Sequence, residues 1–119
     1  MSSARPWPTE LRLDAAKTTL QVTFDSGETF ALQSEYLRVE SPSAEVLGHA
    51  PSQRQIIGGK RGVKITDLEP IGNYAVRILF EDGHDSGLYS WDHLHELGRD
   101  QETKWSAYLR ALKARGLER

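Results

Sequence analysis

The chain of 119 residues contains no cysteine. A disulfide framework, a thiol nucleophile, a cysteine-only zinc site and a cysteine-ligated iron–sulfur cluster are therefore excluded for this chain alone. Long apolar runs are also absent, and none approaches the ~18 residues of a membrane span. The 15 basic and 17 acidic residues give a net charge of −2, which provides no long-range attraction to nucleic acid or anionic lipid. We therefore expect a cytoplasmic protein that binds neither nucleic acid nor membrane.

The composition that is present fits an ordinary globular domain, with 38% hydrophobic and 27% charged residues. A chain of this length corresponds to one domain of typical size. Residues 1–8 are rich in proline and serine. We therefore expect a flexible lead there and a single folded domain over residues 9–116.

Two predicted hairpins dominate the pattern of apolar residues. Apolar side chains recur at every second position at Leu20, Val22 and Phe24, and again from Tyr74 to Phe80, which is typical of strands. An acidic-glycine turn follows each run, and a serine begins a helix after each returning strand. The expected fold class is α+β, with a small antiparallel β-sheet, two hairpin-plus-helix units, short helices and a C-terminal amphipathic helix.

The two units also resemble each other in sequence. Four residues of the first unit recur in the second at a spacing of 56, and the matching pairs are Phe24 and Phe80, Gly27 and Gly83, Leu32 and Leu88, and Ser34 and Ser90. An internal duplication would explain the match, and so would the turn chemistry that any two hairpins share. A duplication predicts that both hairpins occupy related positions in one antiparallel sheet.

Two further helices are expected outside the hairpins. Ser41 and Pro42 suit the first positions of a short helix that ends at Gly48. The C-terminal helix is predicted to follow Asp100 as its N-cap and to end at Gly116. Its apolar positions recur at helical spacing and form one stripe of Trp105, Tyr108, Leu109 and Leu112.

The histidines are the first candidates for chemistry. His84 lies in an Asp-Gly turn between two aspartates, where it suits a metal ligand, a general base or a polar turn residue. His93 and His95 are two residues apart on a predicted helix, so they point to different faces. His49 and His84, completed by a carboxylate, would suit zinc or ferrous iron.

Aromatic residues form a second candidate site. Tyr89 and Trp91, with Arg38 and Arg77, either line a groove for a peptide or partner or belong to the core and its edge. Asn73 lies in a predicted turn before the clearest strand. The chain has no GxSxG, P-loop or HExxH spacing. These residues therefore favour a binding surface over a catalytic set.

Several of these segments together resemble a known family. They are Tyr36–Arg38, Ser41–Glu45, Gly48–His49, Ile71–Val76 and Asp82–Trp91. In this order they are similar to the gamma-butyrobetaine hydroxylase-like N-terminal domain, also called DUF971, over roughly residues 9–115. The resemblance implies a small α+β domain. Members of this family also occur as short bacterial proteins, as fusions to P-loop ATPases of the iron–sulfur carrier type, and before the 2-oxoglutarate- and iron-dependent catalytic domain of carnitine-pathway hydroxylases.

The resemblance also implies a zinc ion held by three cysteines and one histidine. The histidine corresponds to His84, and the cysteines correspond to Ser41, Ser43 and Val46. None of these three can replace a thiolate, so we do not expect the zinc unless His49 and an acidic group rebuild a weaker site. The iron-binding triad of the hydroxylase catalytic domain has no counterpart in this chain.

The sequence therefore predicts a non-catalytic, stand-alone accessory or binding module without a cofactor. We expect a monomer that binds a protein partner near iron–sulfur or 2-oxoglutarate enzymes. The alternative is a zinc- or iron-binding protein with His84 and His49 as ligands. The residues predicted to form the binding surface, at one end of the sheet, are Arg38, Glu45, His49, Asn73, His84 and Trp91.

Overall fold

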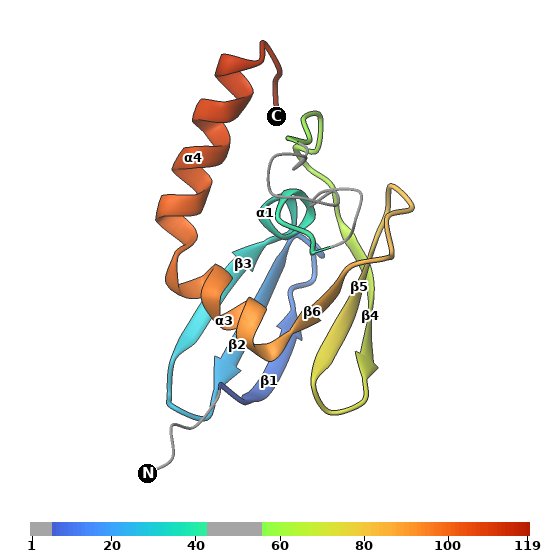
Figure 1. The fold of residues 1–119 in the computed structure, drawn as a ribbon. Helices are drawn as coiled ribbons and strands as arrows, with labels where there is room; N and C mark the ends of the chain where they lie inside the picture. The colour runs from blue at the N-terminus through green and yellow to red at the C-terminus, as the bar shows by residue number, and fades with distance from the viewer. Residues whose placement is uncertain (1–5, 43–55) are drawn as a thin grey trace.

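The computed structural model describes residues 6–42 and 56–119. Within this part, six strands form two antiparallel sheets, and three helices pack against them (Figure 1). The first sheet contains β1 (Pro8–Leu13), β2 (Thr19–Phe24) and β3 (Thr29–Gln33). The second contains β4 (Ile65–Ile71), β5 (Ala75–Phe80) and β6 (Leu88–Ser90). The helices are α1 (Ser34–Val39), α3 (Trp91–Arg99) and α4 (Gln101–Ala114).

The α+β class is confirmed, with both hairpin-plus-helix units and the C-terminal helix present. The expectation of a single sheet is wrong, because each unit forms its own three-stranded sheet. A backbone hydrogen bond from Ile65 N–H to Lys17 C=O, at 2.9 Å, links the two sheets. The short helix predicted from Ser41 to Gly48 falls mostly outside the described residues. No helix within the described ranges is long and apolar enough to cross a membrane.

The two units share backbone hydrogen bonds as well as the order of their elements. In the first turn Phe24 N–H donates to Glu28 C=O, and in the second Phe80 N–H donates to His84 C=O. In each unit the pairing between the first strand and the central strand has a register shift, and both shifts lie opposite the end of the central strand. The sequence match therefore reflects a repeated backbone arrangement, in which each sheet is the counterpart of the other.

Corresponding positions of the two units are 56 residues apart only as far as the hairpin turns. The second turn accommodates one extra residue, so Tyr89 rather than Leu88 takes the position of Leu32. Tyr89 and Leu32 are fully buried, whereas Leu88 is 44% exposed. A shift of one residue in a strand moves its side chains to the opposite face, which is why the predicted Leu32–Leu88 match fails.

Both sheets and two of the helices share one apolar core. Its fully buried members include Leu37 of α1 and Leu94 of α3. Tyr36 O–H in α1 donates to Leu97 C=O in α3 at 2.7 Å, and Tyr89 O–H in β6 donates to Leu37 C=O at 2.5 Å. Each unit therefore provides a buried hydroxyl to the helix of the other, and both hydroxyls have the partner that burial requires.

The serine cap is confirmed for one of the two helices. Ser90 precedes α3, and its Oγ accepts a hydrogen bond from a first-turn N–H at 3.1 Å. Ser34 is instead the first residue of α1, and its hydroxyl donates to Val63 C=O. Asp100 precedes α4 but does not cap it, because its carboxylate pairs with Arg99. A negative charge in this place still favours the N-terminal end of the helix.

The stripe on α4 is confirmed in part. Tyr108 and Leu112 are buried and Trp105 is half-buried, but Leu109 is 38% exposed. Gly116 follows the helix with a φ of +68°, a left-handed conformation that glycine adopts without steric cost. The helix therefore covers the core edge with a narrower stripe than its sequence predicts, and it stops where predicted.

Candidate functional site

The structure divides the predicted binding surface between the two ends of β5. Arg38 and His84 lie at the β5–β6 turn, where both contact Asp82. Asn73 and Trp91 lie at the opposite end, beside the β4–β5 turn. A strand of six residues spans about 17–20 Å, so the expectation of one shared surface is wrong. The two other residues predicted for this surface lie outside the described part of the chain, and they are Glu45 and His49.

The β5–β6 turn carries a polar cluster around Asp82. The Oδ2 atom accepts hydrogen bonds from Arg38 Nε at 2.9 Å and from Lys60 Nζ at 2.6 Å. Burial alone would raise the pKa of the Asp82 carboxyl, but the bonds from Lys60, from His84 N–H and from Arg38 outweigh it and lower the pKa to about 2. Asp82 is therefore ionised at neutral pH and holds α1 and Lys60 against the turn.

His84 lies beside this cluster and bonds a serine. Its Nε2 is 2.9 Å from Ser41 Oγ, and a Cβ on Gly87 would lie 2.5 Å from the same hydroxyl oxygen. A serine beside a histidine is the composition of a nucleophile and its base. Ser41 is completely buried, however, and His84 is only 6% exposed. The covered hydroxyl favours a structural role for the pair.

The two histidines of α3 lie in different surroundings, as their spacing predicts. His95 Nε2 is 2.8 Å from Glu28 Oε1, and this hydrogen bond lowers the pKa of the Glu28 carboxyl. His93 packs against the ring of Tyr89 at a centroid distance of 5.8 Å. Burial lowers the pKa of His93. Neither imidazole therefore forms a common site with His84.

A groove of about 330 Å³ opens at the other end of β5. Its lining includes Trp7, Asn73, Tyr74, Trp91 and Asp92, and we call it the aromatic groove. Trp7 is 48% exposed and Tyr74 is 57% exposed. The Trp91 ring is fixed by a hydrogen bond from Nε1 to Asn73 C=O at 2.8 Å. The groove therefore combines one anchored indole with two widely exposed aromatic side chains.

The groove lies where a proline removes a backbone donor. Pro8 and Ile65 occupy matching positions, each paired with the phenylalanine before a turn. Ile65 N–H bonds to Lys17 C=O, whereas Pro8 has no N–H with which to reach the matching carbonyl of Asn73. Trp91 Nε1 donates to that carbonyl instead. The two sheets are therefore bonded at one end and flanked by the aromatic groove at the other.

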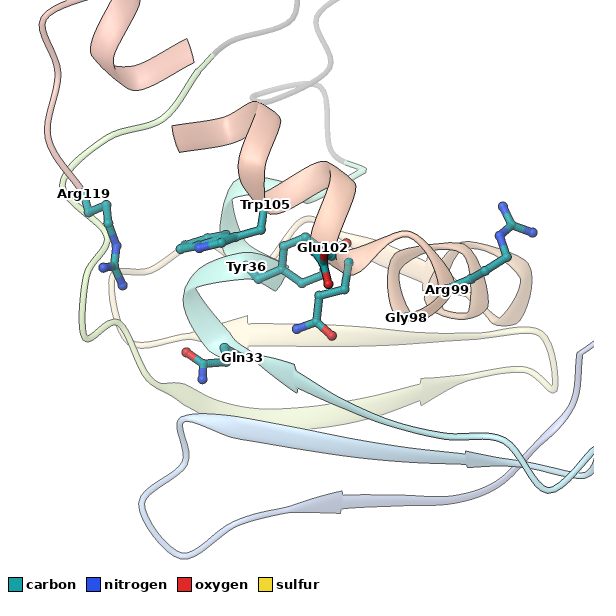
Figure 2. Close-up of a pocket in the computed structure, with 8 residues that line it drawn as sticks. Gln33, Tyr36, Gly98, Arg99, Glu102, Trp105 and Arg119 are labelled. Carbon is teal, nitrogen blue, oxygen red and sulfur yellow. The ribbon is translucent and has the colours of Figure 1, made fainter. Parts of the chain in front are cut away.

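A second hollow, of about 560 Å³, lies where α1 faces the α3–α4 corner (Figure 2). Figure 2 shows the Trp105 ring extending from α4 toward Arg119, whose guanidinium carbon is 5.3 Å from the ring centroid. Arg119 also makes two hydrogen bonds to the Glu35 carboxylate, at 2.7 and 3.1 Å. None of the residues predicted for the binding surface lines this hollow. Arg119 and Glu35 are 84 residues apart, so no local pattern indicates their pairing.

The family suggested by the sequence motifs is confirmed. The sequence profile of the gamma-butyrobetaine hydroxylase-like N-terminal domain matches residues 11–95. The chain belongs to this family. No curated protein matches it.

Solved structures of similar proteins share the fold. Two proteins determined in solution by NMR are 39% and 43% identical to this chain, and both have a TM-score of 0.83. The matches cover 98% and 100% of this chain and 91% and 89% of the other two. A crystal structure from Acidithiobacillus ferrooxidans, of a DUF971 family protein of unknown function, is 35% identical with a TM-score of 0.64. That match covers 76% of this chain and 91% of the other.

The zinc site that the family implies does not fit the described residues. Ser41 provides a neutral hydroxyl where a thiolate is required, and this hydroxyl is hydrogen-bonded directly to His84 Nε2 at 2.9 Å. Within residues 6–42 and 56–119, no group of three histidine, aspartate or glutamate side chains is placed to hold a metal ion. The remaining residues of the implied or alternative sites lie outside the described ranges, and they are Ser43, Val46 and His49.

Proposed function

We propose that this protein is a non-catalytic accessory module that binds a protein partner in the aromatic groove. The observation that carries the proposal is the exposure of Trp7 and Tyr74, 48% and 57% respectively, beside the anchored ring of Trp91. Tryptophan and tyrosine in such positions contribute most of the binding energy at many protein interfaces. An exposed aromatic surface of this kind is typical of an interaction site.

The polar cluster at the opposite end of β5 supports the same function. Arg38 and Lys60 bond Asp82, and Ser41 bonds His84. These contacts join α1 to the second sheet, so side chains that would suit acid–base chemistry serve the fold in this protein. The aromatic groove uses none of them and remains available to a partner.

The family relationship suggests which partners to test first. In carnitine-pathway hydroxylases the corresponding domain accompanies a 2-oxoglutarate- and iron-dependent catalytic domain, and other members accompany ATPases of the iron–sulfur carrier type. Enzymes of these two classes are therefore the first candidates. In this proposal the module supplies a docking surface and the partner supplies the chemistry.

Affinity capture from the native cell, followed by binding measurements, tests the proposal with two matched variants. The groove variant is Trp7→Ser with Tyr74→Ser. The control variant is Leu109→Ser with Leu117→Ser, which removes apolar side chains that are 38% and 43% exposed elsewhere. A captured protein is purified, and isothermal titration calorimetry measures its affinity for each form. We expect the groove variant alone to lose affinity, by at least about tenfold.

Three results would overturn the proposal. The groove variant could bind the purified partner as tightly as the wild type does. The protein alone could turn over a small molecule. Protein purified without a histidine tag could hold a stoichiometric metal ion that His84→Ala releases, and this result would favour the alternative of a zinc or iron site.

A further inference from the structure

We infer that the aromatic groove recognises a proline-rich segment of the partner protein, extended in the polyproline II conformation. This inference rests on the proposed function and specifies the chemistry of the segment that docks. Its basis is a surplus of hydrogen-bond donors over acceptors at the groove, together with aromatic rings that the fold holds in place.

The aromatic residues of the groove are positioned before any ligand binds. The Trp91 ring is fixed by the hydrogen bond of its indole N–H. The Tyr74 ring rests on Gly72, where a Cβ atom would lie 3.0 and 3.1 Å from two of its ring carbons. The backbone of Trp7 is held by Asp25, whose N–H donates to Trp7 C=O at 2.8 Å. A ligand that packs on these rings therefore pays little for ordering them.

The hydrogen-bond acceptors of the groove are largely used within the protein. Backbone carbonyls of the lining accept N–H groups of other residues, and these carbonyls belong to Trp7, Asn73 and Tyr74. Ser90 Oγ accepts the N–H of His93 as the cap of α3. Asp92 is also engaged by an interaction within the protein. The groove therefore leaves few acceptors for the N–H groups of a ligand.

Hydrogen-bond donors, in contrast, remain at the groove. The indole N–H of Trp7 and the hydroxyl of Tyr74 make no hydrogen bond to any residue within 6–42 or 56–119, and the same holds for the side-chain amide of Asn73. An indole N–H can only donate, and a hydroxyl or an amide can donate as well. These positively polarised groups complement a ligand that is rich in carbonyl oxygens and poor in N–H groups.

A proline-rich segment has this combination of groups. Proline has a backbone carbonyl but no N–H, and the polyproline II helix has no internal hydrogen bonds, so its carbonyls face outward. Segments of this kind dock in grooves lined by aromatic side chains. A docked α-helix would use its carbonyls internally, and an added β-strand would require acceptors for its own N–H groups. The groove therefore suits a proline-rich segment better than a helix or a strand.

An NMR titration that follows the three tryptophan indole N–H signals tests the inference. The probe is acetyl-hexaproline amide, and its mirror image built from D-proline is the matched control with the same rings and carbonyls. We expect the L-peptide to shift the signals of Trp7 and Trp91 in a saturable way, with the larger shift at Trp7, because its N–H gains a hydrogen bond. The signal of Trp105, which lies at the other hollow, serves as the internal reference. The D-peptide should produce clearly smaller shifts, because its helix has the opposite hand.

Two variants each remove one donor and keep an aromatic ring. Trp7→Phe removes the indole N–H, and Tyr74→Phe removes the hydroxyl. Each should weaken binding of the L-peptide by about two- to tenfold, because each removes one hydrogen bond to a carbonyl of the peptide. The Trp91 signal reports binding in both variants. Leu117→Ser is the control, since it removes a 43% exposed apolar side chain outside the groove lining, and it should bind the peptide as the wild type does.

The outcomes distinguish the inference from the proposed function. Equal shifts with the L- and D-peptides would overturn the inference, because unspecific contact with the rings does not depend on the hand of the helix. Unchanged affinity in both donor variants would overturn it as well. If the L-peptide leaves the signals of Trp7 and Trp91 unchanged but the groove variant loses its partner, the inference fails and the docking function stands. If the L-peptide does not bind and the groove variant retains its partner, both proposals fail.

Discussion

The turn of the first hairpin contacts the helix of the second unit, and the turn of the second contacts the helix of the first. Glu28 in the first turn bonds His95 of α3, and Asp82 in the second turn bonds Arg38 of α1. Arg38 and His95 are each the fifth residue of their helix. The two units therefore hold each other through matching contacts made in opposite directions.

The matching contacts differ in burial. The Arg38 and Asp82 side chains are only 4% and 20% exposed, whereas Glu28 is 47% exposed. The two ends of the sheets also differ in their hydrogen bonds. At one end, Ile65 N–H and the Ser34 hydroxyl donate to backbone carbonyls. At the other end, beside the aromatic groove, Pro8 and Trp91 occupy the corresponding positions. The aromatic groove therefore occurs at the end of the sheets where the backbone hydrogen bond of Ile65 has no counterpart.

The largest expected effect tests whether both units share one core. Leu37→Ala and Leu94→Ala remove fully buried side chains from matching positions of α1 and α3. Each should lower the free energy of unfolding by about 2–5 kcal/mol in urea denaturation, because each leaves a cavity. Leu109→Ala, at an exposed position, is the control and should have a much smaller effect. A large cost for one leucine only would contradict a shared core.

The next effect compares the two cross-unit contacts. Asp82→Asn removes the carboxylate that pairs with buried Arg38, and it should cost about 2–3 kcal/mol. Glu28→Gln changes the matching exposed contact and should cost much less, since exposed pairs contribute little. Equal melting temperatures for the two variants would show that the burial difference has no energetic consequence.

The pH dependence sharpens the same comparison. The pKa of Asp82 is lowered to about 2 in the folded protein, from 3.8 in the absence of the fold. Its ionised form therefore contributes stability above pH ~4, and this contribution is lost as the pH falls from ~4 to ~2. Asp82→Asn should reduce the loss of stability across this interval. An unchanged acid denaturation profile would contradict the assignment.

A smaller effect tests the equivalence of the two turns. Gly27 and Gly83 have φ values of +94° and +92°, and a Cβ at either position would meet no atom within 4 Å. Gly27→Ala and Gly83→Ala should each cost about 1–2 kcal/mol through backbone strain alone. Thermal unfolding should give nearly the same value for both. A marked difference would show that the turns are not equivalent.

The smallest expected effect concerns matching positions of the two helices. Tyr36 in α1 and His93 in α3 occupy corresponding positions. Burial lowers the pKa of the His93 imidazole. The unfolded chain therefore takes up a proton near pH ~6.5 before the folded protein does, and stability falls as the pH decreases below that value. His93→Gln should remove this dependence. Urea titrations at pH 7.0 and 5.5 would contradict the account if the variant kept it.

Local sequence patterns predict most of the helices and strands but not how the residues of the candidate site are arranged. Alternating apolar residues predict the strands, and Ser90 and Gly116 predict helix ends, because these signals act over a few residues. The split between Asn73 and His84 depends on which end of β5 each residue occupies. The role of Trp7 depends on its position beside the same groove as Tyr74, a residue that is distant in the sequence. Such long-range placement is not encoded in any short pattern, and for this reason the sequence places Trp7 in the flexible lead.

The extra residue in the second turn illustrates the same limit. The spacing of 56 correctly matches Phe24 with Phe80 but incorrectly matches Leu32 with Leu88. A one-residue insertion leaves the turn signal unchanged and reverses the face of every following side chain. The strand pairing and the burial of Tyr89 show that the match has moved. Packing, rather than residue identity, decides the register.

The most direct test of the account compares the two ends of the sheets as docking sites. The photoreactive residue benzoylphenylalanine replaces Tyr74, beside the aromatic groove, in one variant and Thr18, at the opposite end of the sheets, in another. The two positions correspond, because the backbone carbonyl of each accepts the first N–H of the helix that follows in its unit. The account predicts that light crosslinks the purified partner to position 74 and hardly at all to position 18. Equal crosslinking at both positions, or crosslinking only at position 18, would contradict it.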